Sequence, residues 1–192
     1  MRTVVLRSVI ALASCLAFLP SQADAQGKPL DKTIVELALD VNAADGEFDY
    51  LLGAVGCLTD EDGNNAVVDL LSSTEDAYTL FAPTDEAFMH LQADLGIATP
   101  SPEATCALGD DVVFDVLAYH VRTGRRFSNS VFNRKISKTL KMLNGDTLRT
   151  NSNLTLTDVA GRSISVVPPL VNLNASNGVV HVVDGVLLPF VP

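Results

Sequence analysis

Three histidines are the side chains in this sequence best suited to acid–base or metal chemistry near neutral pH. They are His90, His120 and His181, and they lie in three separate segments of the chain. No His-x-x-x-His spacing is present, so the sequence predicts no metal site. The chain also lacks a Gly-x-Ser-x-Gly turn and a Gly-rich phosphate loop. We therefore predict no catalytic residue and no cofactor.

Carboxylates offer a second kind of chemistry, because a pair of them can hydrolyse a glycosidic bond. Asp85 follows Thr84 at the expected start of a helix, and Asp184 forms a tight turn with Gly185, so both have structural roles. The acidic segment 60–65 resembles a calcium loop, but Leu71 stands where the EF-hand needs a glutamate. We interpret this segment as a solvated loop and keep a hydrolase as an alternative.

His120 belongs to a helical stripe with Val113, Val116 and Leu117. This spacing favours a buried imidazole that is hydrogen-bonded to the backbone. The neighbouring Tyr119 could instead place its hydroxyl at the surface. Burial and surface recognition therefore both remain open for this pair.

The N-terminus carries the features of a secretory signal peptide over residues 1–25. Val9–Leu19 is an apolar run too short to span a bilayer, and Ala23-Asp24-Ala25 supplies a cleavage site before Gln26. The alternative is lipoprotein processing, in which Cys15 is lipidated. No other stretch of the sequence is long and apolar enough for a membrane helix, so we expect a secreted or periplasmic protein.

Two cysteines, Cys57 and Cys106, remain after cleavage. Secretion places them where disulfides form and persist, so we predict that they pair. Such a bond closes a loop of about fifty residues and is worth roughly 3–4 kcal/mol. The alternative is a pair of free thiols with redox or metal chemistry.

The mature chain is acidic and long enough for one hydrophobic core. Cleavage removes Arg2, Arg7 and Asp24 from the 13 basic and 23 acidic residues, which leaves 11 against 22 and a net charge of −11. Hydrophobic residues make up 47% of the sequence. An acidic surface argues against nucleic acid and anionic lipid as partners.

The elements that must position these residues are helices first and strands last. Helical spacing recurs around 34–41, 48–55, 67–71, 84–95 and 113–120. A strand is expected at Tyr78–Phe81, and Thr84 is suited to cap the helix that follows it.

After Val121 the apolar residues alternate, which indicates strands. Asn144-Gly145 predicts a hairpin between two of them. The segments Val179–Val183 and Val186–Leu188 are apolar on both faces and are expected to be central strands. The predicted class is therefore α+β.

Three segments resemble characteristic blocks of the fasciclin (FAS1) family. They are Thr79–Phe88 (TLFAPTDEAF), the pair Tyr119-His120, and Asn177–Pro189 (NGVVHVVDGVLLP). The resemblance covers about residues 30–189. It implies a single domain at 26–192, folded as a wedge-like β-sandwich with helices packed around it. The chain departs from the family pattern by additions around Cys57–Asn65 and around Ile97–Asp110, and each addition carries one of the two cysteines.

The resemblance also implies a non-enzymatic adhesion or surface-binding module outside the cytoplasm. Its expected partner is a cell-surface or matrix protein or a polysaccharide. In animal members the Tyr-His pair is linked to adhesion, which would make Tyr119 and His120 binding residues here. Aromatic residues form 6% of the chain and Trp is absent, so a protein partner is favoured over a sugar. A periplasmic carrier with an apolar cavity for a small ligand remains an alternative function.

Overall fold

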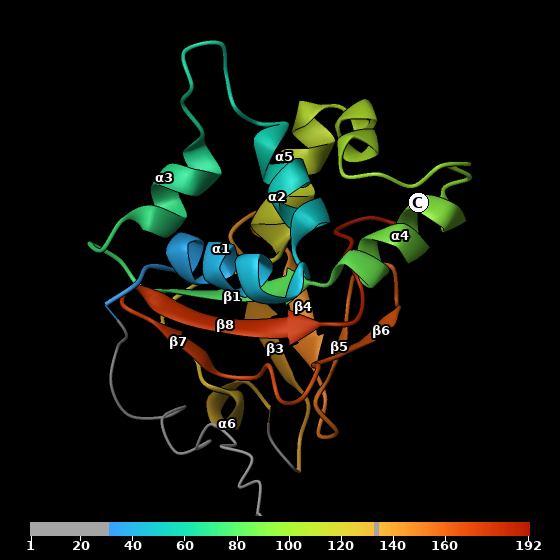
Figure 1. Ribbon diagram of the computed structural model, residues 1–192. Coiled ribbons are helices and arrows are strands. Elements are labelled where there is room, and N and C mark those ends of the chain that lie inside the picture. The colour runs from blue at the N-terminus through green and yellow to red at the C-terminus, as the bar shows by residue number, and fades with distance from the viewer. Residues whose placement is uncertain (1–30, 133–134) are drawn as a thin grey trace, which may run out of the picture.

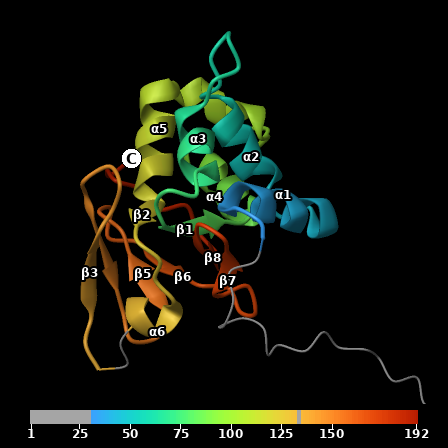
Figure 2. The ribbon, with the colours of Figure 1, turned by 90° about the vertical axis from the view of Figure 1, so that its left-hand side faces the viewer.

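Helices, a central sheet and a second sheet form three stacked layers (Figures 1 and 2). The computed structural model describes residues 31–132 and 135–192. Most helices precede most strands along the chain, so the α+β prediction is confirmed. The predicted signal peptide lies outside the described residues. No helix of the described part is long and apolar enough to cross a membrane.

The helical layer comes mainly from the first half of the chain. A capping box between Thr33 and Glu36 starts the first helix, and Gly46 ends it in a left-handed conformation. Thr84 caps a later helix by accepting from the amide of Ala87, as predicted. The elements of this layer are α1 (Ile34–Asp45), α2 (Asp49–Gly56), α3 (Ala66–Ser72), α4 (Asp85–Asp94), the 3₁₀ helix η2 (Glu103–Leu108) and α5 (Asp110–Tyr119).

The central sheet has the strand order β2-β1-β8-β7. Its strands are β1 (Tyr78–Pro83), β2 (Val121–Thr123), β7 (Leu173–Ala175) and β8 (Gly178–Val183). β1 and β8 run parallel in the middle, and every residue of both is buried. A Cβ at Gly178 would lie 2.3 Å from the carbonyl oxygen of Tyr78, so glycine is required there.

The second sheet has the order β3-β4-β5-β6 and is antiparallel throughout. Its strands are β3 (Lys138–Lys141), β4 (Thr147–Thr150), β5 (Thr155–Thr157) and β6 (Ser163–Ser165), and the short helix α6 (Ser128–Val131) precedes them. β3 and β4 form the hairpin predicted from Asn144-Gly145.

The central sheet separates two hydrophobic cores. Val180 and Val182 of β8 belong to the core beneath the helices, while Val183 belongs to the core between the two sheets. Side chains of a strand alternate between its faces, and this sheet is covered on both faces. That is why β8 carries apolar residues on both of its faces.

A disulfide joins two parts of the helical layer. Cys57 directly follows α2 and Cys106 lies in η2, with their Cα atoms 5.3 Å apart. The bond closes a loop over a sequence separation of 49 residues.

One predicted strand is wrong. Val186–Leu188, called the C-terminal segment below, is buried but forms no strand. Two of its backbone amides donate to side chains, those of His120 and Asp158, in place of a neighbouring strand. Apolar residues on both faces indicate burial, and burial alone does not say which acceptors the backbone finds.

Candidate functional site

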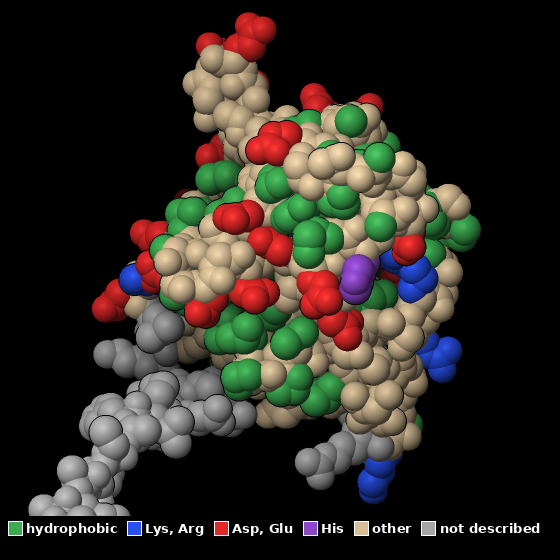
Figure 3. All heavy atoms as spheres, turned by 45° about the vertical axis from the view of Figure 1, so that its right-hand side comes forward, with side chains coloured by type: hydrophobic (Ala, Val, Ile, Leu, Met, Phe, Trp, Pro, Cys, Tyr) green, Lys and Arg blue, Asp and Glu red, His purple; other side chains and the backbone are tan. Residues whose placement is uncertain are grey.

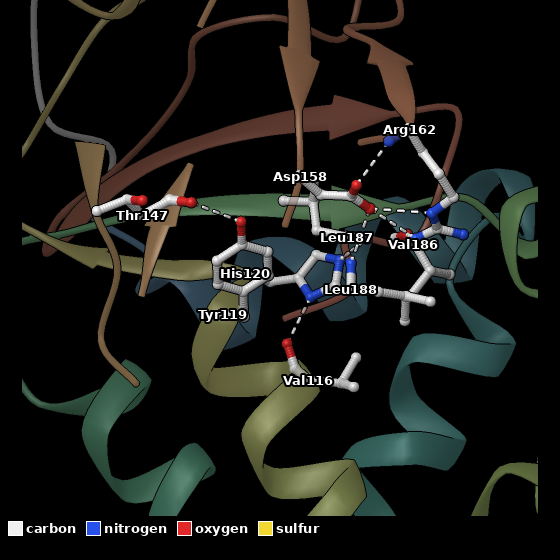
Figure 4. A network of polar contacts seen from close by, with 9 residues as sticks. All are labelled: Val116, Tyr119, His120, Thr147, Asp158, Arg162, Val186, Leu187 and Leu188. Atoms are coloured by element: carbon white, nitrogen blue, oxygen red, sulfur yellow. Dashed lines mark hydrogen bonds and ion pairs between the residues drawn. The ribbon is translucent and has the colours of Figure 1, made fainter. Parts of the chain in front are cut away.

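Tyr119 and His120 lie together where α5 ends and β2 begins (Figure 4). Tyr119 is the last residue of α5, and His120 caps it. Their exposed fractions are 0% and 1%, so neither side chain reaches the surface in this structure. Neither side chain is therefore available for direct contact with a partner in this conformation.

His120 connects α5 to the C-terminal segment. Its Nδ1 lies 2.7 Å from the carbonyl oxygen of Val116, and its Nε2 lies 2.9 Å from the amide nitrogen of Leu187. Because an amide can only donate, Nε2 is the acceptor and Nδ1 carries the proton. Burial lowers the pKa of His120 to about 4, so the imidazole is neutral near pH 7.

Tyr119 points the other way, toward the second sheet (Figure 4). Its hydroxyl donates to the carbonyl oxygen of Thr147 on β4 at 2.8 Å. Burial raises the pKa of Tyr119 to about 12, so it remains a phenol donor at physiological pH. Two adjacent residues therefore fix two different elements to the end of α5.

Asp158 and Arg162 complete the attachment of the C-terminal segment. Asp158 Oδ2 accepts from the amide of Leu188 at 3.1 Å and from Arg162 Nη2 at 2.8 Å. Arg162 also donates to the carbonyl oxygen of Val186. The segment is thus held by side chains from α5 and from the turn between β5 and β6.

The remaining histidines have different surroundings. His181 lies in β8 and faces Phe81 between the sheets, with its ring centroid 5.6 Å away. Its Nε2 lies 2.9 Å from the carbonyl oxygen of Arg126, and burial lowers its pKa to about 4. His90 is exposed beside Glu86. The described residues contain no group of three potential metal ligands, and the three histidines are not brought together.

An apolar pocket of about 260 Å³ opens beside the C-terminal segment. Side chains from α2, α4, η2, α5 and the chain end line it. They include Phe88, Leu95, Leu108, Val112, Val116 and Leu188. Val116 is the residue whose carbonyl oxygen contacts His120, and Leu188 is held by Asp158. The polar network therefore holds two walls of this pocket.

The second sheet presents a polar outer face. Thr139, Arg149, Thr157 and Ser163 form one row across its four strands. No helix among the described residues covers this side in Figure 2. The outward residues of this sheet form the outer sheet face, which consists of Thr139, Lys141, Thr147, Arg149, Thr155, Thr157, Ser163 and Ser165.

Charge is divided sharply along the chain. Residues 33–121, called the acidic half, contain 18 Asp or Glu and no Lys or Arg. Residues 122–192, called the basic half, contain nine Lys or Arg and three Asp or Glu. Figure 3 shows acidic side chains spread over the helical layer, with basic ones at the edges of the view. The formal net charge of −10 for the full sequence conceals this division.

Other residues of the resembling blocks have structural roles. Asn177 donates from Nδ2 to the carbonyl oxygens of Leu71 and Ser73 and accepts from the amide of Ile34. Asp85 accepts from the amide of Tyr50 at 2.9 Å, and Asp184 accepts from Ser165 at 2.6 Å. These contacts join segments distant in sequence, which explains why the blocks carry polar residues inside an apolar context.

Comparison with known proteins agrees with this architecture. A family model for the fasciclin domain matches residues 62–189. The chain therefore belongs to the fasciclin domain family.

Two curated relatives are similar over most of this chain. Protein sll1483 of Synechocystis is 29% identical over 163 residues, which are 82% of this chain and 73% of that protein. Transforming growth factor-beta-induced protein ig-h3 of Sus scrofa is 30% identical over 152 residues, covering 79% of this chain and 19% of the pig protein.

A solved structure shares the fold. It is that of a FAS1 domain pair from the insect cell adhesion molecule fasciclin I, with a TM-score of 0.59 and 18% identity. The match covers 83% of this chain and 51% of the insect chain. The FAS1 fold expected from the sequence is confirmed.

Proposed function

We propose that this chain is an exported, non-enzymatic adhesion module that binds an extracellular protein through its outer sheet face. The observation that carries the proposal is membership of the fasciclin family, together with the likeness to a chain described as a cell adhesion molecule. The signal peptide predicted at residues 1–25 supports export.

The chemistry of the outer sheet face supports this choice of surface. Its hydroxyl groups can donate and accept hydrogen bonds, and Lys141 and Arg149 are both exposed there. The partner that fits is a protein with an acidic contact surface, because opposite charges speed encounter and set orientation. The acidic half repels such a partner, so binding is directed to one side of the molecule.

Tyr119 and His120 act in this proposal as positioning residues. The hydroxyl of Tyr119 holds the backbone of Thr147, a residue of the outer sheet face. His120 fixes the end of α5 against the C-terminal segment and so keeps Tyr119 in place. A Tyr119→Phe variant is expected to keep the fold and weaken binding slightly, since one hydrogen bond is lost and the ring is kept.

The test is binding of purified residues 26–192 to whole cells of the producing organism. The double variant Lys141→Gln, Arg149→Gln removes two positive charges from the outer sheet face. We expect it to weaken binding about tenfold, because charges at an interface set much of its electrostatic attraction. The matched control Ala43→Glu, Ala44→Glu makes the same change in net charge on exposed positions of α1 and should bind as the unaltered chain does.

Protease treatment of the cells identifies the class of partner. Loss of saturable binding after proteolysis supports a protein partner. Binding that survives proteolysis but disappears after periodate oxidation assigns the partner to polysaccharide and overturns the proposal. Equal weakening by both double variants overturns the assignment to the outer sheet face.

A further inference from the structure

We propose that the apolar pocket beside the C-terminal segment binds a small, neutral, apolar molecule. This site lies on the helical layer and is separate from the outer sheet face. It does not depend on the adhesion proposed above, and each can fail without the other.

The size of the pocket favours a bound organic molecule. Its volume of about 260 Å³ exceeds the roughly 150 Å³ of an engineered apolar cavity that stays dry and binds benzene. The lining of this pocket is almost entirely apolar, so water inside it finds few hydrogen-bond partners. An apolar ligand that displaces this water gains affinity, so binding needs no polar anchor.

The polar groups near the pocket are already used by the protein. Gln92 is 2% exposed, and its amide nitrogen donates to the carbonyl oxygen of Ser101 at 2.8 Å and to Thr105 Oγ1 at 3.0 Å. Its amide oxygen accepts from the amide of Ser101 at 2.9 Å. The amide nitrogen and the amide oxygen of Gln92 therefore both have protein partners, and a polar ligand would have to compete with them.

Charge around the pocket selects against anions. No charged side chain lines the pocket. Its lining residues Leu95 and Val112 are next in sequence to the exposed carboxylates of Asp94 and Asp111. The acidic half contains no Lys or Arg, and Arg162, which donates to the carbonyl oxygen of the lining residue Val186, already forms an ion pair with Asp158. A fatty acid or another anion therefore finds no uncompensated positive charge among these residues.

Exposed apolar side chains gather at the mouth of the pocket. Leu95 is 41% exposed, Leu108 is 37% exposed and Phe190 is 38% exposed. Each belongs to the lining, and they come from the end of α4, from η2 and from the chain end. Large apolar side chains that converge on one concavity are typical of a binding site, whereas scattered ones need no explanation.

The test uses a pair of dyes that differ in charge. The neutral dye phenylnaphthylamine and its sulfonated analogue, anilinonaphthalene sulfonate, both gain fluorescence when they enter an apolar site. We expect saturable binding of about one neutral dye per chain and at least about tenfold weaker binding of the sulfonate, because its charge has no partner.

Three variants locate the dye. Val112→Trp fills part of the pocket, and Leu95→Glu places a carboxylate at its mouth; each should weaken binding of the neutral dye about tenfold. Leu39→Glu is the matched control, because Leu39 is 48% exposed on α1 and does not line the pocket. It should leave dye affinity unchanged.

Several results would overturn the proposal. They are the absence of saturable fluorescence, equal binding of the two dyes, and equal weakening by Leu39→Glu. Sedimentation could also give a result that overturns the proposal. If the chain is a dimer that dissociates in the Leu95→Glu and Val112→Trp variants but not in Leu39→Glu, a second copy of the chain covers the pocket.

Discussion

The acidic half and the basic half of this chain differ in charge and in the surface that each presents. The acidic half carries 18 carboxylates without a Lys or Arg and contributes most of the helical layer with its apolar pocket. The basic half carries nine basic and three acidic residues and contributes the polar outer sheet face. Stability gains little from gathering like charges, so the contrast is consistent with the two separate binding surfaces proposed above.

The two halves meet at Tyr119 and His120. Both residues belong to the acidic half, and both bond to backbone groups of the basic half, at Thr147 and Leu187 respectively. The Tyr-His pair is therefore buried in this chain, and its hydrogen bonds connect the end of α5 to β4 and to the C-terminal segment. Three predictions test this connection and the contrast between the two halves.

Removing the hydrogen bonds of His120 should lower the stability of the fold substantially. His120→Leu leaves the buried amide of Leu187 and the carbonyl of Val116 without these partners, which lowers the free energy of unfolding by about 2–5 kcal/mol. His90→Leu is the control, because His90 is exposed, and should change stability by less than about 0.5 kcal/mol. Urea unfolding of both variants measures the difference, and similar values would contradict the assigned role.

Lowering the pH should reduce the free energy of unfolding through one buried histidine in each half. The pKa of His120 in the acidic half and that of His181 in the basic half are both lowered to about 4, with burial as the largest cause. Between pH 6.5 and 4 the unfolded chain then binds more protons than the folded one. The free energy of unfolding should fall through this window by about 3 kcal/mol per histidine.

Denaturant midpoints measured between pH 7 and 4.5 check this prediction. His120→Leu and His181→Leu should each remove a similar part of the pH dependence, despite the opposite charges of the two halves. A flat profile down to pH 5 would show that the two imidazoles are not buried as described. A loss confined to one variant would show that the charge of each half, and not burial, sets these pKa values.

A single added lysine should raise the stability of the fold when placed in the acidic half and lower it when placed in the basic half. Ala93→Lys lies in the last turn of α4 in the acidic half and should raise stability by about 0.5 kcal/mol, through the helix dipole and nearby carboxylates. Thr139→Lys lies opposite Arg149 across β3 and β4 and should lower stability by about 0.5 kcal/mol. Thermal unfolding at low salt measures both shifts, and equal signs would contradict the proposed division of charge.

Much of the fold could be predicted from local sequence patterns. Thr84 was expected to cap a helix and does so, and Asn144-Gly145 was expected to form the hairpin of β3 and β4. Helix stripes and caps are short-range signals, so they survive without knowledge of the partner elements. The short helix α6 was not predicted, because four residues carry too little periodicity.

The candidate site was only partly predictable. The stripe shared by Val116 and His120 favoured a buried imidazole, which the structure shows. Tyr119 was expected to be able to reach the surface, whereas its hydroxyl is bound by Thr147, 28 residues further along the chain. A running count of charge along the chain would have found the acidic and basic halves, which the net charge does not show.

The sequence by itself determined the family, the order of helices and strands, and the burial of β8, because each depends on residue type and local period. Only the tertiary structure decided that Val186–Leu188 is held by His120 and Asp158 instead of by a strand. It also decided where the apolar pocket opens and which row of side chains forms the outer sheet face. These features depend on contacts between residues far apart in sequence, and no local pattern encodes such distances.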